Sequence, residues 1–253
     1  MRNHVDVGLS HQLRRAFAIC KKDIRIYYLK APVIVMGILF PTFMFAAFLI
    51  GRDLDVNFLM SNLTVVTVFF TSTAVTPIVM PWETRSKTLE RLISCPVSVS
   101  TIIFGDILAS FIFGIVFSLV PLIIGLNLGV KVLYPLTFLS GIVLASFCFS
   151  SLAAIFSTPP TDIPANAMML STLIRFPLLF ISGVFIPIEN LPSWGVTVAS
   201  VSPLTYFTDL TIYSITGASH YHVSLDFTIL AGFTIFFLWV SVKLHERNMS
   251  KRM

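Results

Sequence analysis

Residues 101–126, TIIFGDILASFIFGIVFSLVPLIIGL, decide the fold class of this chain. They contain a single charged residue, Asp106. At about 1.5 Å of rise per residue, a helix of this length is long enough to cross the roughly 30 Å hydrocarbon core of a bilayer. We therefore expect this stretch to span a membrane as an α-helix.

Further apolar runs of similar length occur along the chain. Of the 253 residues, 56% are hydrophobic and 11% are charged, against about 25% charged in soluble domains. We therefore predict an all-α polytopic membrane protein, a single domain over residues 1–253 with six transmembrane helices. The expected spans are 31–50, 57–80, 101–126, 132–157, 163–186 and 223–242. Residues 187–222 are broken by prolines, and we expect them to be extracellular or re-entrant.

The distribution of Lys and Arg predicts the orientation, because basic residues are retained on the cytoplasmic side. Seven precede the first span, three follow the second and four lie in the tail, which makes fourteen of 17 on one side. Arg52 and Lys131 lie on the other side. We expect a multi-pass protein of the cell (plasma) membrane with cytoplasmic N- and C-termini. The basic N-terminus lacks the pattern of a removable signal peptide.

The segment before the first span, residues 1–30, is expected to be cytoplasmic and amphipathic. Its apolar residues recur every three or four positions from Ser10 to Lys30, with basic residues between them. The pattern predicts an interfacial helix on the inner membrane surface, or a simple topogenic anchor. The apolar face would hold Leu13, Phe17, Cys20, Ile24 and Tyr27, and the basic face Arg14, Arg15, Lys21, Lys22 and Arg25.

The most informative loop is 81–98, PWETRSKTLERLISCPVS, which lies between the second and third spans. Glu83 and Lys87 are four residues apart in the order that stabilises a helix, and Pro96 ends the segment. Leu89, Leu92 and Ile93 form an apolar stripe, so the segment is predicted to be a short amphipathic helix. Its charged face suits contact with a soluble partner, although a helix that only anchors the loop has the same pattern.

Three segments carry a family resemblance. The order E-x-R-x-K-T-L-E-R-L-I-S-x-P-V-S in 83–98 resembles the coupling helix of ABC-2 type transporter permeases, the membrane subunits of drug and polysaccharide exporters. SGVFIPIENLPSW at 182–194 and SPLTYFTD at 202–209 resemble the family's pattern after the fifth span. Two positions depart from it: Lys87 stands where glycine is common, and Asp106 where a basic residue is common.

The resemblance implies an ABC-2, type V exporter-like fold, with a cytoplasmic coupling helix between the second and third spans and re-entrant helices between the fifth and sixth. It implies a permease that forms a dimer with a second copy or a paralogue and moves an amphiphilic drug, lipid or glycan. An ABC ATPase subunit would dock at the coupling residues. These are Glu83, Arg85, Lys87, Leu89, Glu90 and Arg91.

The sequence has no G-x-x-x-x-G-K-[ST] phosphate loop. We therefore expect no enzyme activity and no cofactor in this chain, with ATP and Mg bound by the partner subunit. Membrane lipids are the other expected partners. Nucleic acid is not expected, because the basic residues flank apolar segments. The cargo, the transport direction and the choice between homodimer and heterodimer stay open.

Polar residues inside the spans are candidates for a pathway. Arg175 lies within the fifth span, where a lone charge is costly, so it has either a pathway role or a structural partner. Asp106, near the cytoplasmic end of the third span, is the acidic residue expected to lie closest to Arg175 in membrane depth. The second span carries a polar stripe, which would line a pathway or pack against other helices. Its members are Asn57, Thr64, Thr67 and Thr71.

The outer segment contains a predicted half-helix that starts at Ser202 and Pro203 and stops at Gly217. Glu189 and Asp209 would either steer substrate or hold the re-entrant fold. The three cysteines and the pair His220 and His222 lack metal-ligand spacing, so no metal site is expected.

Two other functions fit parts of the pattern. A stand-alone secondary transporter or channel would use Arg175 and the threonines. An intramembrane hydrolase would need a complete catalytic motif, and neither Gly105-Asp106 nor His245-Glu246 extends to one.

Overall fold

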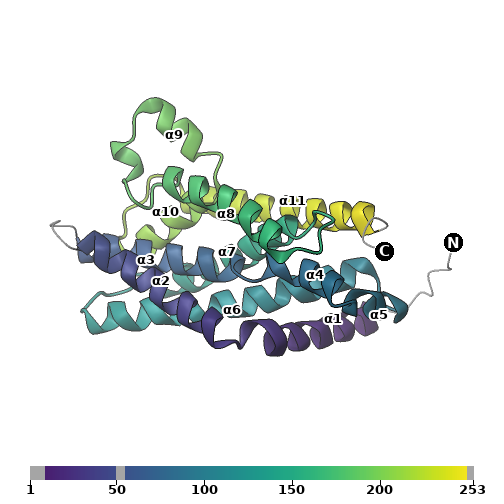
Figure 1. Ribbon diagram of the computed structural model, residues 1–253. Helices are drawn as coiled ribbons and strands as arrows, with labels where there is room; N and C mark the ends of the chain where they lie inside the picture. The colour runs from purple at the N-terminus through teal and green to yellow at the C-terminus, as the bar shows by residue number, and fades with distance from the viewer. Residues whose placement is uncertain (1–8, 50–54, 250–253) are drawn as a thin grey trace.

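The structure, a computed structural model, describes residues 9–49 and 55–249. Every regular element in these two ranges is a helix, in agreement with the predicted all-α class. The long helices run side by side in one elongated bundle (Figure 1). Their bounds are α1 Leu9–Asp23, a π-helical turn η1 Ile24–Tyr28, α2 Ala31–Leu49, α3 Val56–Thr73, α4 Thr76–Arg85, α5 Thr88–Ser94, α6 Val99–Asn127, α7 Pro135–Phe156, α8 Pro164–Ile181, a 3₁₀ turn η2 Ile188–Asn190, α9 Ser193–Ala199, α10 Pro203–Thr216 and α11 Val223–Met249.

Five segments among the described residues are long and apolar enough to cross a membrane. They are Val56–Arg85, which joins α3 and α4, together with α6, α7, α8 and α11. The polytopic architecture is therefore confirmed for five of the expected spans. The expected first span coincides with α2, which is not among the five, so a total of six stays a prediction.

The core of the bundle forms around α3, which contacts α2, α6, α7 and α10. Phe69 of α3 packs edge-on against Phe149 of α7, with ring centroids 5.1 Å apart. Phe149 in turn meets Phe207 of α10 at 6.0 Å. Burial of these large rings stabilises the association of three helices, α3, α7 and α10, that lie far apart in the sequence.

The predicted second span, 57–80, is not one uninterrupted helix. The chain bends at Ala74 and Val75, and α4 begins at Thr76 with Pro77 in its first turn. Proline fits there because the first amides of a helix have no intrahelical acceptor. α4 then continues through Pro81 to Arg85. The first third of the expected coupling segment therefore belongs to the helix that ends this span.

α1 packs directly against α6, and its buried face differs from the predicted apolar stripe. Ala16, Ile19 and Cys20 are buried, whereas Leu13 and Phe17 are 43% and 58% exposed. Gly105 of α6 permits this approach, because a Cβ there would lie 2.7 Å from Ile19. α1 therefore has a face that packs against protein, and its place on the inner membrane surface stays a prediction.

The outer segment folds as η2, α9 and α10. Ser202 caps α10 by accepting the amide of Leu204, and Gly217 ends it with φ 79°. The predicted half-helix is therefore confirmed. Figure 1 shows α9 projecting beyond the bundle near the end of α8. A re-entrant position in the membrane stays a prediction.

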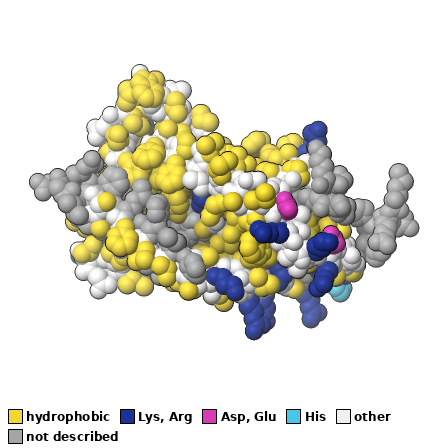
Figure 2. Space-filling model, in the orientation of Figure 1, with side chains coloured by type: hydrophobic (Ala, Val, Ile, Leu, Met, Phe, Trp, Pro, Cys, Tyr) yellow, Lys and Arg dark blue, Asp and Glu magenta, His cyan; other side chains and the backbone are white. Residues whose placement is uncertain are grey.

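Basic side chains gather at one end of the molecule (Figure 2), over the part occupied by α1 and α5 in Figure 1. Apolar side chains cover most of the remaining visible surface. The end of α11 lies at the same end as α1 and α5. This arrangement accords with the predicted orientation, in which that end is cytoplasmic.

Candidate functional site

The short helix α5 is held to the bundle by its apolar side chains, Leu89 and the partly buried Leu92 and Ile93. Leu89 is 2% exposed and packs in a cluster with Met80 of α4 and with Ile102 and Ile103 of α6. α5 is thereby fixed to α4 and to the start of α6.

The opposite side of this region is exposed and charged. We call Trp82, Arg85, Lys87, Glu90 and Arg91 the α5 surface. All five are exposed, and the guanidinium of Arg85 lies 5.9 Å from the centre of the Trp82 ring. Four of the predicted coupling residues, Arg85, Lys87, Glu90 and Arg91, are thus exposed at the end of α4 and along α5.

Glu83 is not part of this surface. The predicted Glu83–Lys87 pair is wrong, because the carboxylate of Glu83 is buried and pairs with Lys22 of α1. Lys87 lies between α4 and α5 instead of one turn further along the same helix. Glu83 therefore links α4 to α1 and does not face a partner.

Lys87 has φ 56° and ψ 22°, the left-handed conformation. Side chains other than glycine pay a steric cost there. This geometry gives a physical reason for the glycine that is common at this position in permeases of the resembling family. The departure at Lys87 therefore places strain between α4 and α5.

Arg175 of α8 is buried, and its contacts are with α3 and with its own helix. Its guanidinium donates to the carbonyl and the hydroxyl of Thr73 at 3.4 and 3.3 Å, and to the Thr172 hydroxyl at 3.4 Å. It also lies 5.6 Å from the centre of the Phe70 ring. No acidic side chain in the described ranges pairs with it. Asp106 lies instead near Asp23 and Lys22 of α1.

The threonine stripe of α3 is enclosed by neighbouring helices. Thr64, Thr67 and Thr71 are each at most 2% exposed. The hydroxyl of Thr64 donates to the carbonyl of Met60, and that of Thr71 to the carbonyl of Thr67. Asn57 stands at the start of α3 and donates its amide to Asp55. The hydroxyl bonds are those expected of helix packing.

Comparison with known proteins identifies the family. A model described as "ABC-2 family transporter protein" matches residues 53–243, which include α5 and all five candidate spans except the end of α11. The chain belongs to the ABC-2 transporter family. It is also similar to ABC transporter G family member 20 of Dictyostelium discoideum, with 26% identity over 206 residues. That match covers 78% of this chain and 28% of the relative's length.

On the opposite side of this ABC-2 protein, Asp209 holds the turn that follows α10. Its two carboxylate oxygens accept the backbone amides of His220 and Tyr221 at 2.9 and 2.8 Å. Asp209 lies in the middle of α10, and its side chain reaches the backbone of the following turn. Its position favours the expectation that it holds the outer fold.

Glu189 is exposed and lines the same outer pocket as Asp209. His220 also lines this pocket, whereas the ring of His222 bonds to Ser224. No group of three His, Cys, Asp or Glu residues in the described ranges could hold a metal ion.

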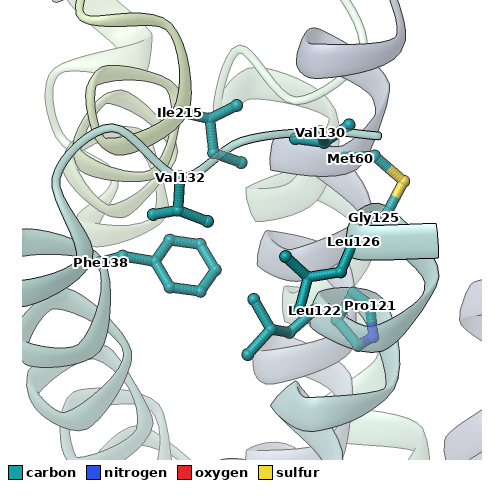
Figure 3. Close-up of a pocket in the computed structure, with 9 residues that line it drawn as sticks. All are labelled: Met60, Pro121, Leu122, Gly125, Leu126, Val130, Val132, Phe138 and Ile215. Carbon is teal, nitrogen blue, oxygen red and sulfur yellow. The ribbon is translucent and has the colours of Figure 1, made fainter. Parts of the chain in front are cut away.

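A second pocket lies where α3, α6, α7 and α10 meet (Figure 3). Its lining is wholly apolar, and Phe138 and Leu122 point toward one another across it. The lining residues are Met60, Pro121, Leu122, Gly125, Leu126, Val130, Val132, Phe138 and Ile215. With no polar group to orient a ligand, it is a gap in helix packing.

Two buried groups escaped the sequence argument. Asp23 had no role in the sequence argument, yet it is 0% exposed and pairs at 3.0 Å with Lys22, which was assigned to the basic face. Asp226 of α11 is also 0% exposed. An acid beside an apolar stripe, as at Asp23, is the signal that could have indicated a buried role.

Proposed function

We propose that this chain is the permease subunit of an ATP-binding cassette exporter. It would form the translocation pathway for an amphiphilic drug, lipid or glycan, with energy supplied by a separate ATPase chain. Membership of the ABC-2 family, whose model matches residues 53–243, is the observation that carries the proposal. In this proposal the chain itself hydrolyses no ATP, and ATP and Mg are bound by the partner.

The α5 surface is the proposed docking site for the ATPase. It combines three exposed cations, Arg85, Lys87 and Arg91, with one exposed anion, Glu90. Mixed charges of this kind fix the register of a partner more than they add affinity. The buried side of α5 supports the same role, because Leu89 connects it to α4 and α6.

The rest of the assembly follows from the same proposal. A second copy or a paralogue would complete the pathway, because one subunit encloses the threonine stripe of α3 by its own helices and leaves no open channel there. The end of the molecule with α1 and α5 would face the cytoplasm of a cell whose plasma membrane holds the protein. Its many basic side chains support this orientation.

The test is ATPase activity in lipid vesicles that contain this protein and an ABC ATPase subunit that co-purifies with it. Glu90→Arg reverses the only negative charge of the α5 surface, so we expect the activity stimulated by the permease to fall at least tenfold. Glu246→Arg is the matched control. Glu246 is exposed near the end of α11, outside the α5 surface, and this variant should keep wild-type stimulation.

Equal stimulation by wild type and Glu90→Arg would reject the α5 surface as the docking site. Transport by the chain alone, driven by a proton or sodium gradient without ATP, would reject the permease proposal in favour of a stand-alone transporter.

A further inference from the structure

Three carboxylates and one ammonium group meet where α1, α4 and α6 pack together. Lys22 pairs with Asp23 at 3.0 Å and with Glu83 of α4. Asp106 of α6 lies within hydrogen-bonding reach of Asp23. Asp23, Glu83 and Asp106 are 0%, 2% and 3% exposed. We call these four residues the inner charge cluster.

The inner charge cluster has an excess of negative charge if every carboxyl group is ionised. The other titratable groups that face it are Cys20 of α1 and Tyr27 and Tyr28 of η1. Burial raises the pKa of Cys20 to about 11 and raises the pKa of both tyrosines, so all three are neutral at physiological pH. One ammonium group therefore faces three carboxyl groups, an arrangement that burial makes costly.

Several oxygens of the cluster lack a hydrogen-bond donor within the described part of the chain. They are both carboxyl oxygens of Asp23, Oε2 of Glu83 and Oδ1 of Asp106. Oδ1 of Asp23 is close to Lys22, but their geometry is that of an ion pair without a directed hydrogen bond. A proton on one carboxyl would remove a negative charge and supply a missing donor at the same time.

Lys22 cannot remove the imbalance by changing its own charge. Burial alone lowers the pKa of Lys22, but the carboxylates of Asp23, Asp106 and Glu83 outweigh this effect and raise it. Lys22 therefore stays an ammonium ion. Burial also raises the pKa of Asp23, although Asp106 and Lys22 act in the opposite direction. A metal ion is disfavoured, because no described cluster has three ligands arranged to hold one.

We propose that the inner charge cluster is a proton-binding site, in which Asp23 and Asp106 share one proton that holds α1 against α6. The proton comes from cytoplasmic water past Lys22, whose side chain is 28% exposed, and only an O–H bond forms or breaks. Two carboxyls in contact titrate as a pair. When the proton leaves, two carboxylates repel each other between α1 and α6.

The site is connected to the α5 surface through a short path. Lys22 bridges Asp23 and Glu83, and Glu83 lies two residues before Arg85 at the end of α4. Loss of the proton therefore changes the charge balance of the bridge that joins α1 to α4. The strength of the contact between α1 and the end of α4, next to α5, would therefore depend on cytoplasmic pH.

The test is the thermal stability of the whole chain in lipid nanodiscs between pH 6 and pH 9. A carboxyl whose pKa is raised on folding stabilises the protein below its unfolded pKa, and this stability is lost as the pH rises through the folded value. We expect the Tm of wild type to fall as the pH rises. Asp106→Asn and Asp23→Asn should each flatten this dependence, and the double variant should be no flatter than either. Asp162→Asn, an exposed acid in the loop before α8, should keep the wild-type dependence.

Equal pH dependence in wild type and Asp106→Asn would overturn the proposal. The pH dependence of Tm should be the same in sodium and in a large organic cation. If it shifts between the two, the cluster binds a metal cation and not a proton. If neither Asn variant folds, infrared spectroscopy decides: the C=O band of a protonated carboxylic acid must be present at neutral pH. It must persist in Asp226→Asn, because Asp226 is a buried acid outside the inner charge cluster, near the start of α11. Its absence there would refute the site. None of these measurements involves an ATPase, so their outcome is independent of the proposed exporter function.

Discussion

Lys22 of α1 forms an ion pair with Glu83 of α4, across 61 positions of the sequence. This contact joins the N-terminal helix to the helix that leads into α5. The sequence pattern placed Lys22 on a basic face and Glu83 among the coupling residues. In the structure the two side chains pair with each other instead.

Lys22→Ala should strongly destabilise the protein, by about 3 kcal/mol, because it leaves Asp23 and Glu83 buried without their cation. The measurement is the free energy of unfolding in detergent or nanodiscs. Lys21→Ala, an exposed neighbour on the same helix, should change stability by less than about 0.5 kcal/mol. Adding Glu83→Gln to Lys22→Ala should recover part of the loss. Similar effects of the Lys22 and Lys21 variants would contradict the burial of this pair.

Lys87→Gly should stabilise the corner between α4 and α5 by about 1 kcal/mol, because glycine adopts positive φ without the steric cost of a side chain. Lys87→Val should have the opposite effect, since a β-branched residue fits this conformation poorly. The control is Lys243→Gly, which places glycine inside α11 and should cost about 1 kcal/mol. A loss of stability in Lys87→Gly would show that the left-handed conformation is not present.

Asp209→Ala should loosen the turn after α10, because the amides of His220 and Tyr221 lose their acceptors. We expect a loss of about 2 kcal/mol and faster hydrogen exchange or proteolysis at residues 217–222. Glu189→Ala should have little effect on this turn, since Glu189 is exposed. Unchanged exchange in Asp209→Ala, together with altered transport, would assign Asp209 to substrate binding instead.

Arg175→Gln should lower stability by about 1–3 kcal/mol, because the carbonyl and hydroxyl of Thr73 lose their charged donor. Arg247→Gln at the exposed end of α11 is the matched control and should be neutral. Unfolding free energy and vesicle transport should be measured on the same preparations. Transport that is lost at full stability would give Arg175 a role in the pathway and contradict the structural one.

The helices themselves were predictable because lipid leaves few alternatives. Any long apolar run must satisfy its backbone groups internally, so residues 99–127 and 223–242 are helical whatever their neighbours are. The start and stop of α10 were also predictable, since the Ser202 cap and the Gly217 terminator act through local geometry. The exposed charges of α5 follow from its position in a polar loop.

The partners of the buried charges depend on tertiary structure alone. Nothing in the spacing of Lys22, Glu83 and Asp106 indicates that α1, α4 and α6 meet, because the contact depends on how whole helices pack. The π-helical turn Ile24–Tyr28 and the close approach at Gly105 bring that side of α1 to the bundle. The sequence by itself determined a bundle of apolar helices long enough to cross a membrane, with a short charged segment after the second. Only the tertiary structure decided which of its charges are exposed and which face one another, because burial changes the energy of a charge and the sequence pattern does not specify burial.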